Sequence, residues 1–185
     1  MKKVLITGGA RSGKSLLAEE LAGKAGGQVL FVATASPGDE EMARRIEDHK
    51  KSRPRHWRTL EVPTNVGDNV RENIGQAKTV VVDCVTLLVS NIFGRYADEF
   101  GEVSNAALVE EVVNGEIRQL LECMATTPAN FIVVTNEVGL GLVPSSKLGR
   151  MYRDLLGKAN RMLAEGSDEV FLMVAGIPVK VKSGK

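Results

Sequence analysis

Cysteine, histidine and aromatic side chains are scarce in this chain. Its 185 residues include 2 Cys and 2 His, and aromatic residues make up 4% of the composition. Cys84 and Cys123 both lie in apolar stretches. Two cysteines are too few for a disulfide scaffold, so we expect both to be reduced core residues of a cytoplasmic protein. A chain with two histidines cannot form most histidine-rich metal sites. Each histidine is therefore considered separately as a candidate functional residue.

Charge of either sign is not in excess, and long apolar runs are missing. Lys and Arg number 24 against 23 Asp and Glu, which gives a formal net charge of +1. Proteins that bind nucleic acid through its phosphates usually carry a large basic excess, so no nucleic-acid partner is expected. No stretch of 18 apolar residues occurs, and the sequence therefore predicts no membrane span. The composition, 43% apolar and 25% charged, is that of an ordinary globular protein.

The hydrophobic pattern alternates between short β-branched runs and longer stretches with helical spacing. Continuous apolar strands separated by helices are typical of a mostly parallel sheet covered by helices on both faces. A last pair of strands around a turn at Gly176-Ile177-Pro178 predicts a C-terminal hairpin. We expect a single α/β domain over residues 1–185. The predicted strands are 3–7, 28–34, 57–62, 79–83, 130–135, 169–175 and 179–182; the predicted helices are 14–25, 39–51, 66–76, 85–93, 106–125 and 148–164, with a polar loop at 94–104.

The strongest motif is a glycine-rich loop between the first predicted strand and the first predicted helix. It matches G-x-x-x-x-G-K-[ST] in full, in the structural context that this motif requires. Glycines let the backbone wrap around a phosphate, and the helix N-terminus directs partial positive charge toward it. Lys14 would add a full charge on the β- or γ-phosphate, and Ser15 could ligate Mg²⁺. The alternative is a plain glycine-rich turn. The loop comprises Gly8, Gly9, Ala10, Arg11, Ser12, Gly13, Lys14 and Ser15.

Two acidic residues follow predicted strands. Asp83 ends the strand TVVVD and is the best candidate for orienting a metal beside the phosphate loop. It could also, or instead, cap the helix that begins at Val85. Glu137 follows the strand NFIVVT. Because ligands bind at the carboxyl edge of open α/β sheets, Glu137 either faces the same cleft or is a solvated loop acid.

His49 lies in an unusually basic segment. Five basic residues surround it: Arg44, Arg45, Lys50, Lys51 and Arg53. Such a segment could bind a triphosphate and present a nucleophilic imidazole. From composition and spacing alone, a solvated helix face with a surface histidine is the favoured interpretation. His56, before Trp57, is interpreted as a packing or capping residue.

Several sequence blocks together resemble one enzyme family. These are ITGGARSGKS, VAT, RIEDHKKSRPRHWRTLE, TNEVGLGLVP and the ending DEVFLMVAGIPVKVK. In order and spacing, over essentially the whole chain, they resemble the bifunctional adenosylcobinamide kinase / adenosylcobinamide-phosphate guanylyltransferases of cobalamin biosynthesis. The resemblance implies two steps. A nucleoside triphosphate phosphorylates adenosylcobinamide, and GMP from GTP then passes through a histidine to the cobinamide phosphate, with release of pyrophosphate.

The resemblance also implies roles for particular residues. The guanylylated histidine is the last residue of R-I-x-x-H, which is His49, and this reverses the interpretation from composition. Asp83 departs from the family pattern, which has Glu, and its shorter side chain could make a direct contact water-mediated. The resemblance further implies Mg²⁺, bound by Ser15 and Asp83, and a homo-oligomer, namely a trimer. The implied nucleotide contacts are the phosphate loop, Ala33, Thr34, Ala35, Lys50, Lys51, Ser52, Arg53, Glu61 and Asp83.

Two other functions remain open at this point. One is a small-molecule kinase of the phosphate-loop type that performs no nucleotidyl transfer. The other is a nucleotide-binding switch, although the sequence has no N-K-x-D motif for reading a guanine base. No local motif identifies a corrinoid site, and the preferred phosphate donor, ATP or GTP, is not determined by any residue pattern.

Overall fold

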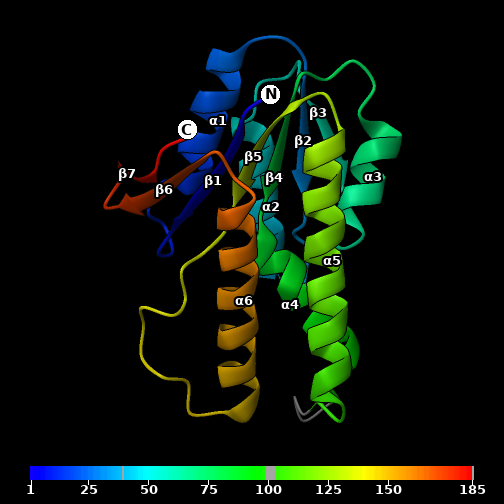
Figure 1. The fold of residues 1–185 in the computed structure, drawn as a ribbon, viewed down its shortest axis with the longest axis vertical. Helices are drawn as coiled ribbons and strands as arrows, with labels where there is room; N and C mark the ends of the chain where they lie inside the picture. The colour runs from blue at the N-terminus through cyan, green and yellow to red at the C-terminus, as the bar shows by residue number, and fades with distance from the viewer. Residues whose placement is uncertain (39, 99–102, 185) are drawn as a thin grey trace.

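The structure is a computed structural model that describes residues 1–38, 40–98 and 103–184, apart from the side chains at 41, 42, 45 and 52. Its centre is one seven-stranded sheet in the order β3-β2-β4-β5-β1-β6-β7 (Figure 1). Six strands are parallel, and only β7 runs antiparallel, to β6. The strands are β1 (Lys3–Gly8), β2 (Val29–Ala33), β3 (Arg58–Glu61), β4 (Thr79–Asp83), β5 (Asn130–Val134), β6 (Glu169–Val174) and β7 (Ile177–Lys182).

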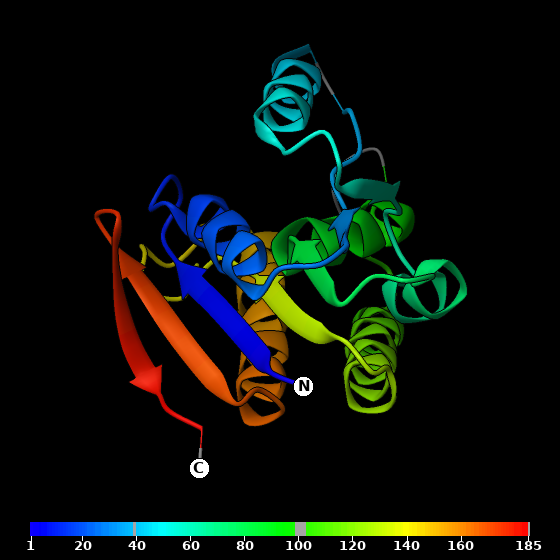
Figure 2. The ribbon, with the colours of Figure 1, turned by 90° about the horizontal axis from the view of Figure 1, so that it is seen from above.

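The helices cover the two faces of the sheet unequally. On one face, Ala18 and Ala22 of α1 pack among strand residues such as Phe31. The other face carries the larger core, to which α3, α4, α5 and α6 all contribute. Figure 2 shows α2 away from the sheet and the other helices. The bounds are α1 (Lys14–Ala25), α2 (Glu40–Ser52), α3 (Val66–Asn73), α4 (Val85–Tyr96), α5 (Ala106–Thr126) and α6 (Lys147–Glu165).

The predicted fold class is confirmed, with two corrections to the elements. Helix α4 continues to Tyr96, into the segment predicted to be a loop. The hairpin turn is Ala175-Gly176, and Ile177 and Pro178 belong to β7. Both turn residues have positive φ, 49° and 84°, which is what a two-residue hairpin loop that matches the strand twist requires. Pro178 is tolerated in a strand because β7 is an edge. Asp39, the predicted start of the second helix, lies outside the described residues.

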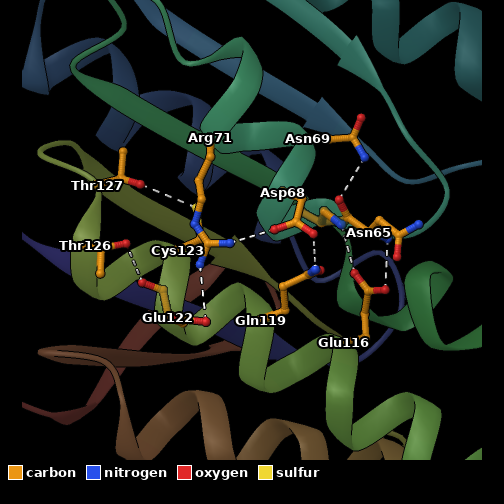
Figure 3. Close-up of polar contacts among 11 residues, drawn as sticks. Asn65, Asp68, Asn69, Arg71, Glu116, Gln119, Glu122, Cys123, Thr126 and Thr127 are labelled. Atoms are coloured by element: carbon orange, nitrogen blue, oxygen red, sulfur yellow. Dashed lines mark hydrogen bonds and ion pairs between the residues drawn. The ribbon is translucent and has the colours of Figure 1, made fainter.

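Helices α3 and α5 are joined by a polar contact region (Figure 3). Glu116 of α5 is 8% exposed, and its carboxylate accepts hydrogen bonds from the backbone N–H groups of Asn65 and Val66, at 2.8 Å each. Farther along, Arg71 donates to Asp68 at 2.6 Å, and Gln119 also donates to Asp68. The first turn of a helix leaves N–H groups without partners, so the Glu116 carboxylate serves as a cap supplied by another helix.

Replacing Glu116 by Ala should therefore destabilise the protein by about 3 kcal/mol, because two charge-assisted hydrogen bonds are lost and their donors remain poorly solvated. Glu122→Ala is the matched control on the same helix. It removes only the 3.5 Å ion pair with Arg71 from a side chain that is 71% exposed, and it should cost less than about 1 kcal/mol. Urea unfolding measures both changes. Equal losses would contradict the capping role.

Candidate functional site

The phosphate loop connects β1 to α1 and packs against the β6–β7 hairpin. A Cβ at Gly8, whose φ is +148°, would lie 2.7 Å from the carbonyl oxygen of Met173, so only glycine fits here. The N–H of Gly176 in the hairpin turn donates to the Ser12 carbonyl at 3.2 Å. The loop thus rests on the neighbouring strand and on the turn that follows it, which fixes its shape.

Lys14 is buried at the start of α1, with 8% of its surface exposed. Its Nζ donates to the carbonyl of Gly9 at 2.6 Å and to Ser12 Oγ at 3.5 Å. Burial lowers the pKa of Lys14, while charge on Cys84 and Asp83 opposes this shift. An ammonium group held in a poorly solvated loop gains strongly from an incoming phosphate.

Asp83 lies at the carboxyl end of β4. The predicted alternative that Asp83 caps the following helix is wrong, because the N-cap residue of α4 is Cys84 and no side chain makes a capping hydrogen bond there. The backbone carbonyl of Asp83 accepts a hydrogen bond from Thr34 N–H at 3.1 Å. The carboxylate interacts electrostatically with Lys14, which links β4 to the phosphate loop.

The VAT block comprises the last two residues of β2 and Thr34, which follows the strand at the same edge of the sheet. The side chain of Thr34 is fully buried; its Oγ1 donates to the Cys84 carbonyl at 2.7 Å and accepts from Cys84 N–H at 2.8 Å. This side chain therefore fastens β2 to β4. Ala33 is buried and Ala35 is half-buried, and neither brings a polar side chain to the site.

The basic segment begins in the last turn of α2, where His49 is exposed. Lys50 forms a 2.7 Å ion pair with Glu61 of β3. Arg53 is half-buried and stacks over the Phe31 ring at 3.8 Å from its centroid. A cavity of about 400 Å³ lies here, lined by Lys50, Lys51, Arg53, Pro54, Arg55, Trp57 and Thr59. The side chain of Ser52 lies outside the described part of the structure.

Two nitrogen atoms of Arg53, Nε and Nη1, are buried and have no hydrogen-bond partner among the residues that the structure describes. Burial lowers the pKa of this guanidinium, while the charges of Asp83, Glu19 and Glu61 oppose that shift. Buried donors without acceptors are unfavourable, so an oxygen-rich anion would satisfy both atoms.

Glu19 is a site carboxylate that the sequence analysis did not identify. It is half-buried on α1, one turn after Ser15. Burial raises its pKa, the charges of His49 and Arg53 lower it, and that of Asp83 raises it. Glu19, on the phosphate-loop helix, is thus coupled electrostatically to the basic segment and to Asp83. Its spacing of four residues from Ser15, which places both on one helix face, is the signal that could have revealed it.

The main chain of Glu137 lies beside the phosphate loop, and the two alternatives for its side chain stay open. Its backbone N–H donates to the Gly8 carbonyl at 3.0 Å. The side chain is half-buried, and its carboxylate lies close to Gly139. The structure thus places the main chain of Glu137 at the edge that carries Asp83 and the phosphate loop.

Ser15 and Asp83 are the predicted ligands of Mg²⁺, and their side chains can be compared with the ligands that this ion requires. Within the part of the chain that the structure describes, no group of three or more His, Cys, Asp or Glu could hold a metal by itself. Ser15 begins α1, half-buried, and Asp83 interacts with the adjacent Lys14. One hydroxyl and one carboxylate suit Mg²⁺, which usually takes its other ligands from phosphates and water.

Comparisons with solved structures agree with this fold. Among solved structures, the RadB recombinase gives a TM-score of 0.51 at 14% identity, over 92% of this chain and 73% of that chain. An ATPase of a bacterial type III secretion system gives a TM-score of 0.53 at 13% identity, over 97% of this chain and 56% of that chain. With the phosphate loop, these likenesses define the class: the chain has the fold of the P-loop nucleotide-binding proteins.

Sequence relatives define the family. A family model described as cobinamide kinase / cobinamide phosphate guanyltransferase matches residues 4–181. The bifunctional adenosylcobalamin biosynthesis protein CobU of Escherichia coli (strain K12) is 43% identical, over 97% of this chain and 99% of the relative. CobP of Pseudomonas aeruginosa is 42% identical, over 96% of each chain. The chain belongs to the cobinamide kinase / cobinamide phosphate guanyltransferase family.

We predict that Asp83→Asn weakens nucleotide-dependent phosphorylation by about 100-fold or more while leaving the melting temperature within a few degrees of the wild-type value. Asn keeps the shape of the side chain but lacks the charge that attracts Lys14 and a cation. Asp154→Asn, on an exposed side chain of α6, is the control and should leave activity unchanged. Steady-state kinetics at saturating Mg²⁺ measures the effect; wild-type rates in Asp83→Asn would exclude a role for its charge.

Proposed function

We propose that this chain phosphorylates adenosylcobinamide with ATP or GTP and then converts the product to adenosylcobinamide-GDP. The observation that carries the proposal is the electrostatic coupling of two cationic elements through shared carboxylates. The charge of Asp83 opposes the lowering of the pKa of both Lys14 and Arg53, and the charges of His49 and Arg53 lower the pKa of Glu19. Family membership over almost the whole chain supports the same pair of reactions.

In the kinase step, the substrate hydroxyl attacks the γ-phosphorus and the nucleoside diphosphate leaves. Backbone N–H groups of Gly8 through Ser15 and the ammonium of Lys14 hold the phosphates in line and stabilise the charge that develops. Mg²⁺, when bound by Ser15 and Asp83, would neutralise charge on the phosphate oxygens. This step requires positioning and charge, and no covalent enzyme intermediate.

In the guanylyl step, an imidazole nitrogen of His49 attacks the α-phosphorus of GTP. A phosphorus–nitrogen bond forms, the bond to the β-phosphate oxygen breaks, and pyrophosphate leaves with the electron pair. The phosphate of the cobinamide phosphate then displaces the histidine. Lys50, Lys51 and the unsatisfied donors of Arg53 are suited to binding the anions involved. Ala33, Thr34, Ala35, Ser52 and Glu61 complete the proposed nucleotide contacts.

The continuous sheet supports the proposal that residues 1–185 act as one nucleotide-binding domain. We further propose a homo-oligomer, a trimer by family resemblance. Its support is exposed apolar surface on β7 and in the segment before α6. The side chains concerned are Ile177, Val179, Val181, Leu140, Leu142 and Val143, all 45% to 96% exposed. No helix within the described ranges is long and apolar enough to cross a bilayer. The reliance on nucleoside triphosphates and the two free cysteines support a cytoplasmic location.

We predict that incubation with GTP and Mg²⁺ adds the mass of one GMP to the protein, on the peptide that contains His49. The adduct should be labile in acid and stable in base, as a phosphorus–nitrogen bond to imidazole is. His49→Asn should abolish the adduct and guanylyl transfer, because an amide is a poor nucleophile. Intact-mass spectrometry measures the adduct.

The matched control is His56→Asn, which changes an exposed histidine seven residues away and should retain the adduct. The His49→Asn protein should also keep appreciable kinase activity, since phosphoryl transfer to the substrate hydroxyl does not involve this imidazole. An adduct that persists in His49→Asn would place the nucleophile elsewhere. Absence of any adduct on the wild-type protein would favour the alternative function, a kinase without nucleotidyl transfer.

A further inference from the structure

Asn136, in the TNEVG block after β5, has no role in the proposed reactions described above. We propose that its side-chain amide donates a hydrogen bond to the γ-phosphate of the bound nucleoside triphosphate and stabilises that group as it is transferred. The inference rests on the proposed kinase step and adds a residue to its machinery.

The sheet topology places Asn136 beside the phosphate loop. Strand β5 lies between β1, which leads into the loop, and β4, which ends in Asp83. Backbone pairing with β1 continues beyond the end of β5: Thr135 N–H donates to the Ile6 carbonyl and Glu137 N–H to the Gly8 carbonyl, each at 3.0 Å. Asn136 is therefore held level with the first residues of the loop.

The alternation of side chains gives the direction in which Asn136 points. Ile132 and Val134 are buried on the α1 face of the sheet. Thr135 points to the opposite face, where its hydroxyl donates to Asn160 of α6 at 2.7 Å. Because successive side chains of an extended segment point to opposite faces, Asn136 points to the α1 face.

The alternation of side chains along β4 directs Asp83 to the α1 face as well. Val81, two residues earlier in β4, is buried on the α1 side, and the Asp83 charge acts on Lys14 at the start of α1. The amide of Asn136, the carboxylate of Asp83 and the ammonium of Lys14 therefore converge at one edge and on one face. Together they provide a neutral donor, a metal ligand and a cation for one phosphate group.

Asn136 is also held by a rigid frame that leaves its amide available. Its backbone N–H donates to Thr86 Oγ1 at 2.8 Å, and its carbonyl accepts from Asn160 Nδ2 at 2.9 Å. Thr86 and Asn160 are themselves buried. The half-buried amide of Asn136 makes no hydrogen bond to any residue that the structure describes. A fixed donor that need not reorganise is what stabilises charge developing in a transition state.

The test compares Asn136→Ala and the isosteric Asn136→Asp with the wild-type protein. Removing one such donor should lower kcat for cobinamide phosphorylation by about 100-fold. The preference of the protein for a non-hydrolysable ATP analogue over ADP should fall several-fold, because only the triphosphate reaches the amide. The GMP adduct on His49 should still form to its full extent. Asn130→Ala, at the opposite end of β5, is the control and should change none of these values.

The outcomes separate this inference from the function on which it rests. A kcat within threefold of the wild-type value in both variants would overturn it. So would a loss of kcat accompanied by an equal loss of GMP adduct and a large drop in melting temperature, since that pattern indicates a purely structural residue. If the wild-type protein failed to phosphorylate cobinamide, the kinase proposal would fall, and an unchanged ATP-analogue preference in the variants would separately refute the γ-phosphate contact.

Discussion

The site depends on the parallel pairing of β4, β5 and β1 in a single register. This pairing brings Asp83, the segment after β5 and the phosphate loop to one edge of the sheet. Because side chains of a strand alternate with a period of two, a slip of one residue would turn Asp83 or Asn136 to the opposite face. Because these strands are apolar on both faces, it is the close packing of their side chains against the helices on each face that opposes such a slip. The geometry of the site therefore depends on the packing of the core.

The second organising feature is charge held where water has limited access. Lys14 and Arg53 are cations whose pKa values burial lowers, and Asp83 counteracts the shift at both. The pKa of Glu19, on the phosphate-loop helix, responds to the charges of His49, Arg53 and Asp83, so that helix is coupled electrostatically to the basic segment. Desolvated cations with incompletely satisfied donors favour the arrival of a polyanion. These cations are thus available to a polyanion, and no cluster of three or more metal-ligating side chains occurs among the residues that the structure describes.

The sequence predicted the strands well because parallel strands buried on both faces are continuous apolar runs, as TVVVD and NFIVVT show. The sequence also predicted the phosphate loop, because a backbone that wraps around a phosphate requires glycine at particular positions of the loop. The predicted hairpin turn is one residue too late because Gly and Pro mark it in the sequence, whereas the turn begins at Ala175, a residue that rarely adopts positive φ. Glu19 and Asn136 were missed because their significance comes from neighbours distant in sequence. The spacing from Ser15 gives only the helix face of Glu19; its coupling to His49 and Arg53 arises from tertiary packing, which no local pattern encodes.

Hydrogen–deuterium exchange with and without a non-hydrolysable GTP analogue and Mg²⁺ tests the central claim most directly, namely that one edge of the sheet binds the triphosphate. The account predicts slower exchange in peptides covering 8–15, 49–53, 83–86 and 135–137. It predicts no change in peptides covering 165–169 and 182–184, which contribute to the cavity of about 830 Å³ around the start of β6 and the end of β7. Protection confined to that cavity, with the phosphate loop unaffected, would contradict the account.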